Sequence, residues 1–147
     1  MSHSYSNNHV HVVYSTLHRK DLIPPEFKKR LYSFLAEIAQ EHKIPLLAAG
    51  GMPNHSHLLF LLPPTITLAD AINKFKTNSS RFLRKQEIDF NWQTGYGSFA
   101  VSASQIETVK NYIRNQREHH KKRTFEQEFV AMLKKARITY DPKYVFG

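Results

Sequence analysis

The sequence predicts an α+β fold, a ferredoxin-like antiparallel sheet with helices on one face. Segments rich in β-branched and aromatic residues alternate with segments whose apolar residues recur at helical spacing, in the order β-α-β-β-α-β-α-α. The second and third predicted strands are joined by Gly, Pro and Asn residues, which favour an antiparallel hairpin with a loop. The length of 147 residues is that of one domain, so we expect a single domain over residues 1–147.

The predicted strands follow from local composition. Residues 9–16 (HVHVVYST) are β-branched and aromatic, and two short apolar runs follow at 44–49 and 55–62. Residues 50–54 (GGMPN) form the expected loop between these two runs. The last strand, residues 90–101, is aromatic but contains Gly95 and Gly97, which indicates a mobile or close-packed loop within it.

The predicted helices show apolar residues at helical spacing together with start signals. Pro24 and Pro25 open a helix over residues 26–42, and Thr67, three residues before an acid, caps one that runs to about residue 84. Ser102 or Ser104 caps a third helix that runs to about residue 121. A last helix begins at Thr124, and the tail from residue 139 has no clear pattern.

Composition excludes several classes of site. The chain has no cysteine, which rules out a disulfide framework, a cysteine nucleophile and a thiolate zinc site. The first residues do not resemble a signal peptide, and no run approaches the roughly 20 apolar residues that a membrane span needs. We therefore expect a cytoplasmic protein with no membrane partner.

The positive charge is concentrated in two predicted helices. The formal net charge is +9. Residues 74–85 form one cationic segment without any acid, and residues 110–123 form a second in which Glu118 is the only acid. Such clustering suits a polyanion bound on one region, although two solvated helix faces would have the same pattern. The residues we select as nucleic-acid contacts are Lys74, Lys76, Arg81, Arg84, Lys85, Arg117 and Lys121.

Two histidine pairs have metal-ligand spacing. His55 and His57 begin a predicted strand, where residues two apart project from the same face, about 6.6 Å apart along the strand. Two such imidazoles can hold a divalent ion if a third ligand comes from elsewhere. His9 and His11 have the same spacing, so spacing alone does not choose between the pairs. A structural role for both pairs also stays open.

A candidate nucleophile and third ligand lie on the second basic helix. Tyr112 and Gln116 are four residues apart and share one helix face, at the edge of its apolar stripe. A phenol beside a divalent ion is suited to attack on a phosphodiester. Tyr112 could equally be a packing residue, and His119 is a rival ligand.

Three segments follow one another along the chain: residues 52–59 (MPNHSHLL), 92–101 (WQTGYGSFAV) and 109–120 (VKNYIRNQREHH). In this order they resemble the IS200/IS605-type single-tyrosine transposases and their REP-associated relatives, and the resemblance extends from about residue 9 to about residue 129. A lone HxH is weakly specific, but PNHxHLL followed by WQxGYG and YIxNQ is specific.

The resemblance implies an HUH endonuclease with defined roles for particular residues. His55, His57 and Gln116 would bind Mg²⁺ or Mn²⁺, while Tyr112 would form a 5′-phosphotyrosine and release a 3′-OH. It favours His55 and His57 over His9 and His11, which fall on the family's first strand. The implied partners are single-stranded DNA with hairpin ends and a second copy of the chain in a homodimer. Ser56 departs from the bulky apolar residue usual between the histidines, so packing behind that strand could differ.

Two other functions keep the same charge pattern. A ferredoxin-like nucleic-acid-binding module without chemistry would leave the histidines and Tyr112 structural. A domesticated endonuclease would process repeated hairpins without moving a genetic element.

Overall fold

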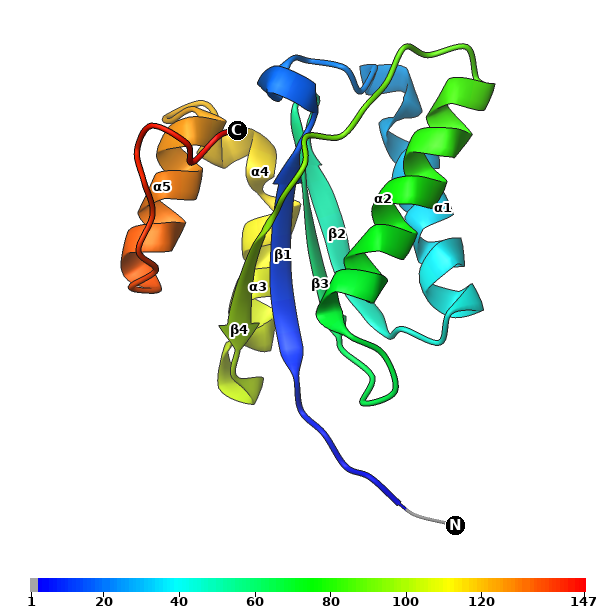
Figure 1. Ribbon diagram of the computed structural model, residues 1–147, viewed down its shortest axis with the longest axis vertical. Coiled ribbons are helices and arrows are strands. Elements are labelled where there is room, and N and C mark those ends of the chain that lie inside the picture. The colour runs from blue at the N-terminus through cyan, green and yellow to red at the C-terminus, as the bar shows by residue number, and fades with distance from the viewer. Residues whose placement is uncertain (1–2) are drawn as a thin grey trace.

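The computed structural model describes residues 3–147 (Figure 1). Within that range the strands are β1 (His9–Ser15), β2 (Leu46–Met52), β3 (His55–Leu61) and β4 (Gly97–Val101). The helices are α1 (Lys28–Glu41), α2 (Leu68–Lys85), α3 (Ile106–Arg114), α4 (Gln116–His119) and α5 (Phe125–Lys135). Short 3₁₀ turns lie at Leu17–Arg19, Pro25–Phe27 and Ala103–Gln105. No helix in the described part of the chain is long and apolar enough to cross a bilayer.

The sheet has the topology that the element order predicts. Its strands run in the order β2-β3-β1-β4, and every adjacent pair is antiparallel. The register places Val13 opposite His57 and Ser15 opposite His55. This βαββαβ arrangement with an antiparallel sheet is ferredoxin-like, so the predicted α+β fold class is confirmed.

One face of the sheet is covered by α1 and α2, which together enclose the main core. Residues at alternate positions of β1 and β3, including Tyr14 and Phe60, pack there against Leu31, Leu35 and Phe75. Thr67 caps α2 as predicted, because its side chain accepts a hydrogen bond from the Asp70 N–H.

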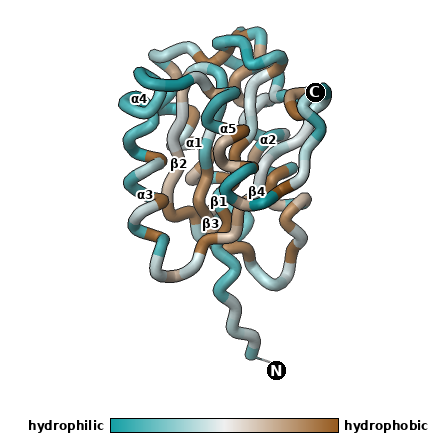
Figure 2. The backbone as a smooth tube through the Cα atoms, turned by 90° about the vertical axis from the view of Figure 1, so that its left-hand side faces the viewer, coloured by the Kyte–Doolittle hydropathy of each residue, from teal (hydrophilic) through white to brown (hydrophobic). Residues whose placement is uncertain are grey.

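The opposite face is covered as well, so the prediction of helices on one face is wrong for the C-terminal helices. Leu59, Val101 and Ile113 form a second buried cluster between the sheet and α3. Figure 1 shows α3 on the other side of the sheet from α1 and α2, and Figure 2 shows hydrophobic residues along β3 between them. The physical reason lies in β3: residues 55–60 are all buried, so both faces of this strand need cover. The helices α3 and α5 provide that cover.

Two glycines explain why β2 is longer than predicted. The strand continues through Gly50 and Gly51, and the loop expected at residues 50–54 shrinks to a turn around Pro53 and Asn54. A Cβ on Gly50 would lie 3.0 Å from the Ile113 carbonyl oxygen, and one on Gly51 would collide with the His55 carbonyl oxygen. The glycines therefore allow α3 and β3 to approach the strand closely.

Two other boundaries differ from those predicted. Residues 90–96 form an extended connection, held to the end of β1 by an isolated bridge between Thr16 and Trp92, and β4 begins only at Gly97. The helix predicted up to residue 121 breaks at Asn115 into α3 and α4. The break lies between Tyr112 and Gln116. The last helix begins at Thr124 as predicted, with a capping box that involves Gln127.

Candidate active site

The first part of the site comes from the start of β3. His55 and His57 project from the same face of the sheet, and both are fully buried. The Nδ1 atom of His55 lies 2.7 Å from Asn54 Oδ1, so that nitrogen carries the hydrogen and Nε2 presents its lone pair inward. Burial, followed by the neighbouring His57, lowers the pKa of His55 to about 3, which keeps this imidazole neutral at neutral pH.

Glu128, on α5, brings a carboxylate to the two imidazoles. Its Oε1 lies 3.2 Å from His57 Nε2 and 3.5 Å from His55 Nε2, and its side chain is fully buried. The ligand atoms of the three residues all lie within 4.8 Å of one another. Burial alone would raise the pKa of Glu128, but the hydrogen bond and charge of His57 outweigh it and hold the pKa below its usual range.

Gln116, at the start of α4, completes the set that the sequence predicts. Its Oε1 lies 3.0 Å from His55 Nε2, and the residue is buried. His120, one turn later, places Nε2 3.0 Å from the same oxygen and 3.2 Å from Glu128 Oε1. The structure thus brings His55, His57 and Gln116 together, and adds Glu128 and His120.

The spacing of these atoms fits a divalent ion. An octahedral ion with metal–ligand distances of about 2.1 Å separates adjacent ligand atoms by about 3.0 Å. Five of the distances between these side chains lie between 3.0 and 3.5 Å, and the ligand atoms of His55, His57 and Glu128 lie within 4.8 Å of one another. A mixed set of imidazole nitrogens and carboxylate or amide oxygens suits Mn²⁺, while its oxygen members suit Mg²⁺. The residues present therefore fit the implied cofactor.

Tyr112, on α3, faces the same carboxylate from the other side. Its hydroxyl donates a hydrogen bond to Glu128 Oε2, and the Arg123 guanidinium donates to the phenolic oxygen over 3.4 Å. Burial, together with the bond to Glu128, raises the pKa of Tyr112 to about 12. His119 is not part of the metal-ligand group: its ring stacks on Tyr112 with centroids 4.4 Å apart.

His11 supports the site from β1. Its Nε2 lies 2.8 Å from His57 Nδ1, which leaves the Nε2 of His57 toward Glu128. Burial and the neighbouring His57 lower the pKa of His11 to about 3. Of the two HxH pairs, then, the His55 pair converges on the carboxylate. His11 contacts His57 at Nδ1, on the side of the ring away from Glu128.

Ser56, the departure from the family pattern, points to the opposite face. It is fully buried, and its hydroxyl lies 3.0 Å from that of Tyr32 on α1. A buried hydrogen-bonded pair thus fills the space behind the histidines, where the family usually has a bulky apolar side chain.

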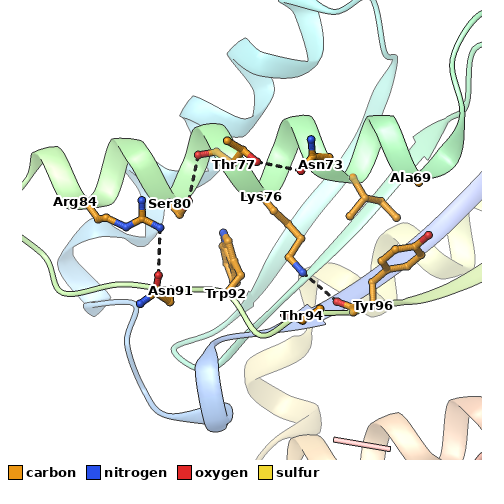
Figure 3. A pocket seen from close by; sticks show the side chains of 12 residues that line it. Ala69, Asn73, Lys76, Thr77, Ser80, Arg84, Asn91, Trp92, Thr94 and Tyr96 are labelled. Atoms are coloured by element: carbon orange, nitrogen blue, oxygen red, sulfur yellow. Dashed lines mark hydrogen bonds between the residues drawn. The ribbon is translucent and has the colours of Figure 1, made fainter. Parts of the chain in front are cut away.

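The two basic helices lie on opposite sides of the sheet, which differs from a single polyanion-binding region. The first basic segment is on α2, and two of its cations are used internally (Figure 3). Lys76 donates to the Gln93 and Gly95 carbonyl oxygens at 2.7 and 3.0 Å, and burial lowers its pKa. Arg84 donates to the Phe90 carbonyl oxygen at 3.1 Å. These two cations hold the 90–96 connection against α2.

The other selected cations point to solvent, and Lys121 also pairs with the exposed Glu118 at 3.1 Å. Their side chains are exposed, on α2 for the first three and on or just after α4 for the last two: Lys74, Arg81, Lys85, Arg117 and Lys121. Trp92 is half-buried and donates to Ser79 Oγ at 3.0 Å, whereas Tyr96 is 42% exposed.

Sequence reasoning missed Glu128, His120 and Arg123. One signal existed for Glu128, because this acid lies on the apolar stripe that Phe125 and Leu133 define in α5. No spacing rule links that helix to histidines some 70 residues earlier, since their contact is created by the fold.

Comparison with known proteins places this geometry in a family. The family described as IS200-like transposases matches residues 4–116, a range that includes Tyr112, Gln116 and both HxH pairs. The chain belongs to this family. The side chains of Arg123 and Glu128 come from the segment beyond the matched residues.

Individual relatives agree with this membership. Transposases for the insertion sequence element IS200 of Salmonella typhimurium and Salmonella typhi are each 23% identical over 128 residues, which cover 82% of this chain and 84% of theirs. A candidate transposase from Deinococcus radiodurans R1 is similar in structure, with a TM-score of 0.59 and 24% identity over 79% of this chain and 96% of that one. A REP-associated tyrosine transposase bound to a REP hairpin superposes with a TM-score of 0.61 and 14% identity, over 82% and 74% of the two chains.

Proposed function

We propose that this IS200-like transposase cuts and rejoins single-stranded DNA through Tyr112, at an HUH-type metal centre. The observation that carries the proposal is the shared carboxylate: Glu128 contacts the Tyr112 hydroxyl with one oxygen and the His57 imidazole with the other. A nucleophile and a pair of metal-type ligands therefore face one small volume.

The chemistry at Tyr112 is a transesterification. The phenolic oxygen forms a bond to phosphorus while the bond from phosphorus to the 3′ oxygen breaks, which leaves a 5′-phosphotyrosine and a free 3′-OH. Glu128 is placed to accept the phenolic proton, because its Oε2 already accepts the Tyr112 hydroxyl hydrogen. The 3′ oxygen takes a proton from water as it leaves, and Glu128 releases the phenolic proton to solvent. The energy of the phosphodiester is kept in the tyrosyl link, so rejoining needs no nucleotide cofactor.

The metal-binding role belongs to His55, His57 and Gln116, with Glu128 as a further ligand. A bound Mg²⁺ or Mn²⁺ supplies Lewis-acid polarisation of the phosphodiester. The His55–Asn54 and His57–His11 hydrogen bonds orient the two imidazoles so that Nε2 faces the site.

The proposed substrate is single-stranded DNA with hairpin ends. One structural neighbour is described as bound to a REP hairpin, and the exposed cations of α2 and α4 would contact phosphates.

We also propose a homodimer. Tyr112 meets the histidines of its own chain here, so the contacts described are made within one protomer.

The test is covalent trapping on a hairpin-bearing oligonucleotide with Mg²⁺ or Mn²⁺. In a 5′-phosphotyrosine the DNA downstream of the cut stays on the protein, so a 3′ label should migrate with the chain and a 5′ label should be released. Mass spectrometry should place the adduct on Tyr112. Tyr112→Phe should lose the adduct and keep DNA binding, while Tyr144→Phe, at an exposed tyrosine, should behave as the parent chain.

Other outcomes select the competing functions. An adduct on another tyrosine, or a 3′-linked product, would contradict the mechanism. Binding without any adduct would favour a nucleic-acid-binding module. Cleavage of hairpins without rejoining would favour a domesticated endonuclease.

A further inference from the structure

A basic cleft lies beside the candidate active site. It has a volume of about 850 Å³ and is built from three segments that are distant in the sequence. They are the turn after β1, the turn between β2 and β3, and the connection from α4 to α5. We call it the basic cleft, and its defining residues are Arg19, Lys20, Asn54, Lys121, Lys122 and Arg123.

The charge of the basic cleft favours an anionic ligand. Five of its lining residues are cations, against two acids, Asp21 and Glu126. Lys20 and Lys122 are exposed and come from different segments, one after β1 and the other after α4. Arg19 is partly committed, because it donates to the Phe146 carbonyl oxygen at 2.8 Å. Lys121 is exposed as well, but it pairs with Glu118 at 3.1 Å. Lys20 and Lys122 are therefore the exposed lysines best placed to neutralise phosphates.

The walls of the basic cleft are bonded directly to the candidate active site. Asn54 lies 2.7 Å from His55 Nδ1, and His120, another lining residue, contacts Gln116 and Glu128. Arg123 lies closest to the nucleophile, with Nη2 3.4 Å from the Tyr112 oxygen. A strand lying in the cleft would thus lead to the place where Tyr112 acts.

Arg123 also lines a second cleft, of about 570 Å³. That cleft includes Tyr112 itself together with apolar side chains such as Phe99, Val109 and Met132. Arg123 therefore lines both the basic cleft and the more apolar cleft that contains Tyr112. Such a position suits a phosphodiester held by a guanidinium, with charged backbone on the cationic side.

We propose that the basic cleft binds the sugar-phosphate backbone of the DNA strand next to the cleaved bond, and that Arg123 contacts the scissile phosphate. This inference rests on the proposed function, because it assumes that Tyr112 attacks a phosphodiester. The planar guanidinium can donate two parallel hydrogen bonds to phosphate oxygens, which lysine cannot reproduce.

Binding tests the cleft separately from catalysis. We expect Lys20→Ala with Lys122→Ala to weaken binding of hairpin-bearing single-stranded DNA and to reduce the slope of log affinity against log salt by about 1.4, at about 0.7 per lost contact. The matched control is Lys29→Ala with Lys134→Ala, which removes the same charge from exposed positions on α1 and α5. It should leave the slope close to that of the parent chain. An unchanged affinity and slope in the Lys20 and Lys122 variant would overturn the proposal.

Chemical modification of the DNA locates the contact. A neutral methylphosphonate in place of the phosphates flanking the cut should weaken binding to the parent chain. The same change should have little further effect on the Lys20 and Lys122 variant, because its partner cations are already absent. Full and equal losses in both proteins would contradict contact between these lysines and that stretch of backbone.

Single-turnover cleavage at saturating DNA tests Arg123. We expect Arg123→Ala to lower the cleavage rate by about 10²- to 10³-fold, and Arg123→Lys to restore little, while Mn²⁺ affinity stays within a few-fold. An unchanged cleavage rate would show that Arg123 does not contact the reacting phosphate. If the parent chain forms no adduct with any hairpin, the proposed function and the role of Arg123 both fail. The binding experiments still decide the cleft.

Discussion

The Glu128 carboxylate joins Tyr112 to His57: Oε2 accepts the phenolic hydrogen and Oε1 lies 3.2 Å from the imidazole Nε2. Tyr112 lies on α3 and His57 on β3, whereas Glu128 lies on α5, outside the range that matches the family. Glu128 is fully buried, so its charge is balanced by these contacts and not by water.

Replacing Glu128 by Gln tests whether this residue is a metal ligand. The amide keeps the size of the side chain but removes its negative charge, so Mn²⁺ affinity measured by calorimetry should fall by about 10- to 100-fold. Glu126→Gln removes an acid from the same helix without touching the histidines, and should leave the affinity unchanged. Equal affinities for the parent chain and Glu128→Gln would mean that the carboxylate only positions Tyr112.

His57 and His11 should differ in how strongly they affect cleavage. His57→Ala removes a direct ligand, so cleavage should fall by orders of magnitude while DNA binding largely survives. His11→Ala removes the hydrogen bond to His57 Nδ1 and ring packing but no direct ligand, so metal affinity should fall about 10- to 100-fold and excess metal should recover much of the activity. If His57→Ala cut DNA normally, or if only His11→Ala lost all cleavage, the assignment of His57 as the direct metal ligand would be wrong.

Acid should destabilise the metal-free protein. The pKa values of His55 and His11 are lowered to about 3, so the folded state binds fewer protons than the unfolded state below about pH 6.5. Stability is therefore present above pH 6.5 and falls as pH falls toward 3, by roughly 2 kcal/mol per histidine at pH 5. Glu128, whose pKa is also lowered, adds a loss below its ordinary pKa.

Urea unfolding at pH 7.5 and pH 5, in the presence of a chelator, measures this dependence. His11→Asn should reduce the difference between the two pH values, because one of the buried neutral imidazoles is gone. A free energy of unfolding that is equal at both pH values, or higher at pH 5, would contradict the prediction.

Local sequence patterns predicted the order of strands and helices along the chain, and the main helices, well because those features depend on short-range periodicity. The βαββαβ frame follows from strand-like composition, turn residues and helical spacing, and the Thr67 and Thr124 caps form as expected. His55, His57 and Tyr112 could be assigned to one site only because the resemblance to single-tyrosine transposases implies that they act together.

Contacts between residues that are far apart in the sequence could not be predicted from local patterns. The strand pattern of β3 is apolar on both faces, yet nothing in it says that α3 and α5 provide the second cover. The bonds of Lys76 and Arg84 to the 90–96 connection depend on tertiary packing, so two cations selected for DNA are engaged within the protein. Glu128 reaches the histidines for the same reason.

Gly50 should be required for the seating of α3, and so for the position of Tyr112. A Cβ at this residue would lie 3.0 Å from the Ile113 carbonyl oxygen and 3.2 Å from its side chain, so the helix must move away from β2. Gly50→Ala should lower the free energy of unfolding by about 1–3 kcal/mol, as overpacking does elsewhere. Because Ile113 follows Tyr112, the cleavage rate should fall more than DNA affinity does.

Gly95→Ala is the matched control: its Cβ meets open space, and its positive φ should cost only about 1 kcal/mol. Urea unfolding and single-turnover cleavage measure both variants. If Gly50→Ala were as stable and as active as the parent chain, the close approach of α3 to β2 would not be what positions the nucleophile.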